Sequence, residues 1–307
     1  MAESNIALRL LTVTIPLFSL FIVGCGDGTT DKRDMQSLRT TSKPVRAAQI
    51  DFLTPIKVGN RPADVGAMIT HLMVVDLDGN GLKDILFSDA DAETVCWLAQ
   101  DPKGTFTERV LGEPVKGPAH LATADIDKDG DLDVLVASMG VVAPTDDPIG
   151  AVVVLENDGN QNFTNRYLIE GVPRVTDVEP GDFDGDGDID LVVGQFGYAT
   201  GEIRWMENIG DGWNFRSHIL QSLSGTIHTP VADMDGDGDL DIVALVSQEW
   251  EEIYVFENDG TANFEQKMVF GSTNEDFGSS GITLVDLDGD TDLDILYTNG
   301  DSFDYLP

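Results

Sequence analysis

One acidic segment that returns five times constrains the fold of this chain more than any other feature. Its clearest copy lies in ADMDGDGDLDIVAL, residues 232–245, where alternating Asp and small residues give way to an apolar stretch. The first Asp residues of successive copies are separated by 49, 57, 51 and 53 residues. A self-similar period near 50 residues is typical of repeat architectures, in which each repeat is one supersecondary unit.

Each period also contains four short apolar segments, rich in Val, Ile and Leu. One segment precedes the acidic copy and one follows it, while a third ends at a turn such as NDGNQNF, which starts at Asn157. The fourth begins at an equivalent aromatic residue in four periods: Phe106, Phe163, Phe215 and Phe264. Apolar runs of this length predict buried strands, and Asn-Asp-Gly predicts a hairpin turn. Four strands per period with no helical pattern predict one blade of a β-propeller.

The sequence therefore predicts an all-β protein, a β-propeller of four-stranded blades with five recognisable repeats. The approximate repeats are residues 66–115, 116–171, 172–220, 221–271 and 272–307, of which the last is short. Residues 47–59 resemble a fourth strand without its blade. Two alternatives follow: this strand closes the last blade to give a five-bladed ring, or the chain is a truncated form of a larger propeller.

The N-terminal 24 residues are similar to a signal peptide of the lipoprotein type. Arg9 precedes an apolar run over residues 10–24, which is shorter than the ~20 residues that cross a bilayer. The run ends in IVGC, which resembles the lipobox of bacterial lipoproteins and implies lipidation of Cys25. An ordinary secretory signal and an uncleaved anchor are the alternatives. Cys96, the other cysteine, lies in a predicted strand, so we expect a buried thiol.

These features predict an exported protein of the cell envelope, at the outer membrane or the cell surface. Its lipid anchor would be its only contact with the membrane. Residues 25–48 lack periodicity and predict a flexible tether, and residues 49–307 form the predicted propeller.

The net charge of −37, from 55 acidic and 18 basic residues, excludes a nucleic acid as the partner. The apolar fraction of 41% is too high for a disordered acidic chain. A folded protein with this charge needs cations or a basic partner to offset it.

The spacing of the acidic residues predicts calcium sites. We number the five acidic loops, residues 76–84, 125–133, 182–190, 233–241 and 286–294, from 1 to 5. Positions 1, 3, 5 and 9 carry the candidate ligands: Asp76, Asp78, Asn80 and Asp84; Asp125, Asp127, Asp129 and Asp133; Asp182, Asp184, Asp186 and Asp190; Asp233, Asp235, Asp237 and Asp241; Asp286, Asp288, Asp290 and Asp294. Calcium takes about six to eight oxygen ligands, and a loop wrapped around it presents alternate side chains. Solvated turns are the alternative, but they do not need carboxylates at all these positions.

The pattern DxDxDGxxD between two strands, in units near 50 residues, resembles the FG-GAP/VCBS repeat family, which includes the propellers of integrin α-chains. The resemblance covers about residues 50–307 and implies one Ca²⁺ between the first two strands of each blade, up to five in all. Asn80 makes acidic loop 1 less acidic, and Thr291 replaces the Gly found at position 6 of the other loops. We expect Thr291 to loosen that turn.

A second group of residues lies five positions before its acidic loop. His71, His120 and His228 share this place, which Asp177 and Gly281 occupy in the other repeats. Equivalent positions fall on one rim of a propeller channel, opposite the calcium loops. Two interpretations stand: a ring that binds a ligand or metal, or imidazoles that cap strand starts by hydrogen bonds. The variable loops on the same face add two candidate stacking residues, Tyr198 and Trp250.

The expected function is that of an exported calcium-binding propeller acting as a binding, adhesion or scaffold module. Its partner would be an extracellular or periplasmic protein or glycan. The sequence contains no GxSxG, HExxH, P-loop or Cys–His motif, so we do not expect an enzyme. The alternative is a carbohydrate-active lyase or hydrolase that uses the histidine rim or the variable loops.

Overall fold

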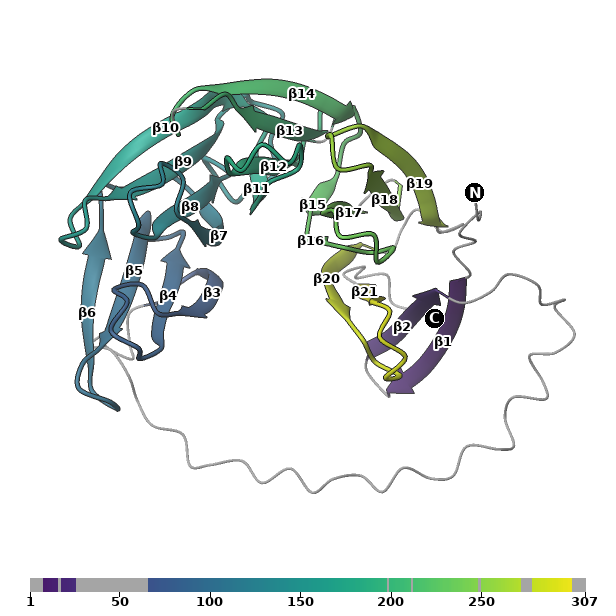
Figure 1. Cartoon of the computed structure of the whole chain (residues 1–307), viewed down its shortest axis with the longest axis horizontal. Coiled ribbons are helices and arrows are strands. Elements are labelled where there is room, and N and C mark those ends of the chain that lie inside the picture. The colour runs from purple at the N-terminus through teal and green to yellow at the C-terminus, as the bar shows by residue number, and fades with distance from the viewer. Residues whose placement is uncertain are drawn as a thin grey trace, which may run out of the picture.

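The computed structural model describes residues 8–15, 18–25, 66–197, 199–210, 212–247, 250–271 and 278–299. These residues form β-strands, turns and loops, with no helix among them. The strands build successive antiparallel sheets that stand side by side along an arc (Figure 1). The prediction of an all-β protein with four-stranded blades is confirmed.

We call the sheets blades 1 to 5. Blade 1 contains β3 (Ile69–Val75), β4 (Asp84–Asp89), β5 (Thr94–Gln100) and β6 (Phe106–Leu111). Blade 2 contains β7 (Pro118–Ala124), β8 (Asp133–Ser138), β9 (Gly150–Asn157) and β10 (Phe163–Val172). Blade 3 contains β11 (Val175–Gly181), β12 (Asp190–Gln195), β13 (Glu202–Asn208) and β14 (Phe215–Gln221).

Blade 4 contains β15 (Thr226–His228), β16 (Val231–Ala232), β17 (Asp241–Val246), β18 (Glu252–Asn258) and β19 (Phe264–Gly271). Its inner strand is split into β15 and β16 around Pro230, which has no N–H to donate to the ladder. Blade 5 contains β20 (Ser279–Val285) and β21 (Asp294–Asn299), followed outward by β2 (Phe18–Cys25) and β1 (Leu8–Ile15).

The innermost strands β3, β7, β11, β15 and β20 face the centre of the arc, and each contacts the next (Figure 1). All five share a register shift at the same place. The shifts fall at Ile69/His71, Pro118/His120, Val175/Asp177, Thr226/His228 and Ser279/Gly281. Such bulges bend a strand and re-aim its side chains. The same β-bulge therefore recurs in the inner strand of every blade.

The core lies between the blades. Every residue of β8, β12 and β17 is buried, which explains why the segments after the acidic loops are continuously apolar rather than alternating. One core cluster joins Leu86 and Trp97 of blade 1 to Val136 of blade 2, and three further clusters fill the following interfaces. Each fully buried Val or Leu contributes roughly 1.5–3 kcal/mol. Hydrophobic burial therefore holds each blade to its neighbours, and Cys96 of β5 is buried in blade 1 as expected.

In blade 5 the N-terminal strands β2 and β1 occupy the outer places (Figure 1). The apolar, β-branched composition of residues 8–25 suits strands as well as a signal segment. Signal cleavage, the tether and the lipid on Cys25 therefore stay predictions, and residues 47–59 lie outside the described residues. No helix in the described part of the chain is long and apolar enough to cross a membrane. Blades 1 and 5 stand at the two ends of the arc, and the five-bladed ring and the larger propeller both stay predictions.

Candidate metal centres and a channel cluster

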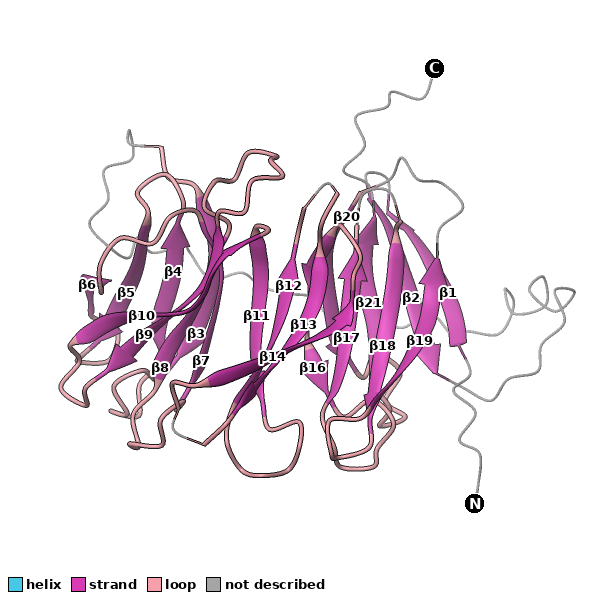
Figure 2. Cartoon of the chain, turned by 90° about the horizontal axis from the view of Figure 1, so that it is seen from above, coloured by secondary structure: helices cyan, strands magenta, loops and turns pink. Residues whose placement is uncertain are grey.

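The acidic loops join the first strand of each blade to the second, so antiparallel pairing places them all at one end of the sheets. Figure 2 shows loops gathered at the two ends of the strands. In each acidic loop the N–H of position 6 donates to Oδ2 of the Asp at position 1, over 2.8–3.1 Å. The N–H of position 5 donates to Oδ1 of position 3, over 3.1–3.3 Å. These bonds shape five equivalent loops, and in acidic loops 3, 4 and 5 Oδ1 of position 1 accepts a further N–H from position 4.

The loop turn needs left-handed backbone at positions 4 and 6. Four loops place Gly at each of these positions. Lys128 at position 4 of acidic loop 2 has φ 62°, and Thr291 at position 6 of acidic loop 5 has φ 85°. Thr291 still donates its N–H to Asp286, so the turn is kept rather than loosened as we expected. Thr291, a β-branched residue, is therefore held in a strained left-handed conformation.

Carboxylate oxygens of the acidic loops gather in clusters whose size suits a hard cation. In four loops, single oxygens of three acidic residues lie within 4.8 Å of one another. Oδ1 of Asp76 and Oδ1 of Asp125 are buried without a hydrogen-bond partner. Burial and then repulsion from Asp129 raise the pKa of Asp127. A buried carboxylate oxygen without a donor is unfavourable, and a set made of oxygens alone is the one that calcium prefers.

The Asp at position 9 is a bridge between strands, a role that the sequence analysis missed. Its Oδ2 accepts the N–H of position 2 over 2.7–3.3 Å in all five loops. In four blades its Oδ1 accepts the N–H of the residue that ends the third strand, over 2.7–2.8 Å. Those residues are Gln100, Asn157, Asn208 and Asn258. The amide side chain at the end of each third strand was the signal that could have revealed this bridge.

Burial of position 9 has an electrostatic consequence. Asp133, Asp190 and Asp241 are almost fully buried. Burial raises the pKa of each to about 6, although the backbone donors oppose the shift. Without a nearby cation these carboxylates therefore hold protons more tightly than exposed aspartates do.

The acidic loops also connect neighbouring blades. The carbonyl of Phe183, in acidic loop 3, accepts Nδ2–H of Asn258 at 2.7 Å and the N–H of Ala262 at 3.0 Å, both from blade 4. Lys128 of acidic loop 2 pairs with Asp188 of acidic loop 3. An ordered acidic loop therefore supports the next blade as well as its own.

At the other end of the inner strands, the structure brings the histidine rim together. The ring centroids of His71 and His120 lie 4.0 Å apart, and those of His120 and His228 lie 6.3 Å apart. His71 Nδ1 accepts the N–H of Leu121 in blade 2 at 3.0 Å, so this imidazole does cap a neighbouring strand. Burial and the neighbouring His120 lower the pKa of His71 to about 4, which keeps it neutral.

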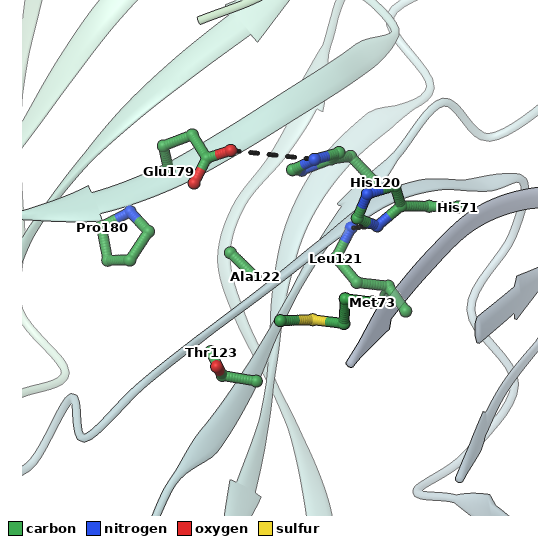
Figure 3. Close-up of a pocket in the computed structure, with 8 residues that line it drawn as sticks. All are labelled: His71, Met73, His120, Leu121, Ala122, Thr123, Glu179 and Pro180. Atoms are coloured by element: carbon green, nitrogen blue, oxygen red, sulfur yellow. Dashed lines mark hydrogen bonds and ion pairs between the residues drawn. The ribbon is translucent and has the colours of Figure 1, made fainter. Parts of the chain in front are cut away.

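Asp177 and Glu179 of β11 complete this group. Asp177 Oδ1 lies 2.7 Å from His120 Nδ1, and Glu179 Oε1 lies 3.7 Å from His120 Nε2. Although burial opposes it, the charges of His120 and His228 hold the pKa of Asp177 well below its usual value. Burial and repulsion from Asp177 raise the pKa of Glu179 to about 8. His71, His120 and Glu179 line a pocket of about 350 Å³ (Figure 3).

Sequence analysis missed Glu179. It lies two residues after Asp177, so strand alternation places both side chains on the same face of β11. The equivalent residues in the other repeats are Met73, Ala122, Pro230 and Thr283. A copy-by-copy comparison of the inner strands would have singled it out.

The variable loops lie at the same end. Arg174 stacks on Phe196 at 4.8 Å and donates to the carbonyl of Val142 at 3.2 Å, which ties the loops of blades 2 and 3 together. A pocket of about 500 Å³ next to this loop is lined by Val141, Ile149 and Tyr167 among others. Trp250 is 44% exposed in the loop of blade 4, and Tyr198 lies outside the described residues.

The family comparison agrees with this repeat architecture. The FG-GAP-like repeat family matches residues 76–136, 141–193, 182–244 and 233–297, which make up more than half of the chain. Among solved structures, the exotype rhamnogalacturonan lyase YesX is similar at 14% identity and a TM-score of 0.37, over 97% of this chain and 69% of that chain. No curated protein matches the sequence.

Proposed function

Because this chain belongs to the family of FG-GAP-like repeat proteins, we propose that it is an exported, calcium-stabilised propeller that binds a protein or a glycan and catalyses no reaction. The observation that carries the proposal is the contrast between the two ends of the blades. One end repeats the same oxygen cage, whereas the other end carries loops that differ in length and expose apolar side chains. Variable loops on a rigid scaffold are where binding usually resides.

Calcium would be held by the residues at positions 1, 3, 5 and 9 of the acidic loops, about one ion per repeat. The ion would supply positive charge to carboxylates that otherwise repel one another. The buried free oxygens of Asp76 and Asp125 support this assignment. Since the acidic loops contact neighbouring blades, calcium binding would also stabilise the packing of blades.

The partner would bind at the end of the variable loops. Val141, Ile149 and Tyr167 are all at least 40% exposed, and they line one pocket next to the loop tied down by Arg174. Trp250 offers a flat apolar ring on blade 4. Exposed rings beside a polar rim suit sugar faces and peptide side chains. A lipid on Cys25 would present this surface outside the cell membrane.

The test is a screen of the calcium-loaded protein against glycan and extracellular-protein arrays, followed by two variants. Trp250→Ala removes an exposed ring from the variable end, and Leu287→Ala is its matched control, because Leu287 is 45% exposed in acidic loop 5. We expect Trp250→Ala to weaken binding about tenfold and Leu287→Ala to leave it unchanged. Equal loss in both variants would contradict the proposed surface. Release of product from a bound glycan would instead support the carbohydrate-active alternative.

A further inference from the structure

We propose that His120, Asp177 and Glu179 form a second kind of metal site, which binds a divalent transition-metal ion such as Zn²⁺. The site lies between β7 of blade 2 and β11 of blade 3, at the opposite end of the inner strands from the acidic loops. Single ligand atoms of these three residues lie within 4.8 Å of one another. The site would be independent of the calcium cages in both place and chemistry.

The geometry around His120 is that of an oriented metal ligand. Asp177 Oδ1 lies 2.7 Å from Nδ1 and favours a proton on that nitrogen, so a metal ion would take the place of the proton on Nε2. Nε2 then faces Glu179 Oε1 at 3.7 Å (Figure 3). Two ligands of one tetrahedral zinc ion lie about 3.4 Å apart, given bonds of about 2.1 Å. A small side-chain movement would therefore let both atoms bind one ion.

Asp177 is itself held in place. Its Oδ2 accepts the N–H of Thr229 at 2.5 Å and lies 3.6 Å from Nδ1 of His228. The side chain is 1% exposed, so it cannot turn to solvent. This fixed carboxylate would orient His120 and support the ion's charge from behind the imidazole.

The charges at this place also call for a cation. Glu179 is three-quarters buried, and its cationic neighbour in the described part of the chain is His120. His120 therefore lies between two carboxylates that it cannot offset completely. A buried carboxylate without full compensation is unfavourable, and a divalent ion would remove the deficit. Blade 3 alone carries acidic residues at both places, so this feature is a departure from the repeat rather than a copied one.

The donor set selects the class of metal. An imidazole nitrogen with carboxylate oxygens suits Zn²⁺, Co²⁺ or Ni²⁺, whereas calcium prefers oxygens alone. His71 cannot add a ligand, because its Nδ1 already accepts the N–H of Leu121 and Nε2 carries the proton. It would remain a hydrogen-bond donor at the pocket wall. The pocket of about 350 Å³ leaves room for water or a small anionic ligand at the open coordination positions.

The experiment is a Co²⁺ titration of the full chain saturated with Ca²⁺, followed by visible absorption and displacement with Zn²⁺. Calcium saturation occupies the acidic loops, and nitrogen ligation in a low-coordinate site gives Co²⁺ stronger absorption than an oxygen cage does. We expect one Co²⁺ per chain, displaced by one Zn²⁺. Glu179→Gln should weaken binding at least tenfold, and His120→Ala should abolish the absorption. His218→Ala is the matched control and should leave binding unchanged, because His218 lies on β14, the outermost strand of blade 3, and pairs with Glu207 at 2.8 Å.

Three results would overturn the site. One is the absence of Co²⁺ absorption in the calcium-saturated wild type. The others are binding that persists in both His120→Ala and Glu179→Gln, or an equal loss in His218→Ala. Calcium-dependent melting of each variant shows whether it folds. If His120→Ala does not fold, Glu179→Gln still tests the site, because glutamine keeps the volume of the glutamate side chain.

Discussion

The two ends of the blades differ in how faithfully the repeats are copied. At the acidic end, the same hydrogen bonds from positions 5 and 6 recur in all five loops, and even the exceptional Thr291 keeps them. At the opposite end of the inner strands, which we call the channel end, three blades carry a histidine five residues before the acidic loop. Blade 3 carries Asp177 at this position and blade 5 carries Gly281. The loops beside it differ in length and in exposed side chains.

This difference separates residues that build the fold from residues that specialise it. A feature needed by every blade must be present in every copy, because each blade interface has to form. A feature present in one copy contributes nothing to the other interfaces, so a buried charge there needs a separate explanation. Substitutions at the acidic end should therefore affect stability, and substitutions at the channel end should affect binding.

Calcium removal should have the largest effect on stability. If it had no effect, the contrast between a structural acidic end and a binding end would fail. An ion at 100 times its dissociation constant contributes about 2.7 kcal/mol per site, so several sites together shift the unfolding midpoint by more than about 20 °C. We expect that fall when the protein is melted in chelator rather than in calcium, followed by circular dichroism. An unchanged midpoint would show that the acidic end is not a metal-dependent scaffold.

A pair of substitutions sharpens the comparison within the acidic end. Asp190 accepts N–H groups from Asn208 at 2.7 Å and Phe183 at 3.3 Å, and Nε1–H of Trp205 at 3.1 Å. Asp190→Ala leaves these donors without an acceptor and should cost about 3 kcal/mol even in chelator, and more in calcium because Asp190 is also a candidate ligand. Asp184→Ala removes a candidate ligand and should destabilise only the calcium-loaded protein. Urea unfolding in both conditions measures the difference, and identical behaviour of the two variants would remove the distinction between bridge and ligand.

The pH dependence in chelator tests the burial of the bridging carboxylates. The pKa of Asp133, Asp190 and Asp241 is raised to about 6 from the usual 3.8, so the folded state holds protons that the unfolded chain releases. Their contribution is complete below about pH 4 and is lost as pH rises through about 6. We expect the metal-free protein to lose on the order of 2 kcal/mol between pH 5 and pH 7.5. Stability that rises over this range in chelator would contradict the assignment, and Asp190→Asn should reduce the dependence.

The smallest effect concerns the irregular acidic loop 5. Thr291→Gly relieves a β-branched residue at φ 85° and should stabilise the calcium-loaded protein by about 1 kcal/mol. The reverse change at the equivalent place in loop 4, Gly238→Thr, should destabilise it by a similar amount. Melting in calcium measures both. A destabilising Thr291→Gly would show that the threonine side chain has a role of its own.

Local features of the fold could be predicted from the sequence. The segment TVCWLAQ forms β5 over Thr94–Gln100, because buried apolar residues and flanking turns fix its limits without reference to distant residues. The shared place of His71 and His120 followed from the repeat alone. The bridge made by Asp190 could not be predicted in the same way, since it depends on the register between β12 and β13. The Glu179 cluster depends on which inner strands are neighbours and on the bulge that aims their side chains.

The hydrogen bond from Asn258 of blade 4 to the carbonyl of Phe183 in acidic loop 3 makes the packing of these successive blades directional. Blade 4 covers acidic loop 3, where Phe183 at position 2 is 0% exposed, whereas Leu287 at the same position of acidic loop 5 is 45% exposed. Ion uptake by one blade should consequently promote uptake by its neighbour, as in a linear chain of coupled units. During synthesis, each cage would mature one blade behind the emerging polypeptide, so that assembly proceeds vectorially from the N-terminal side.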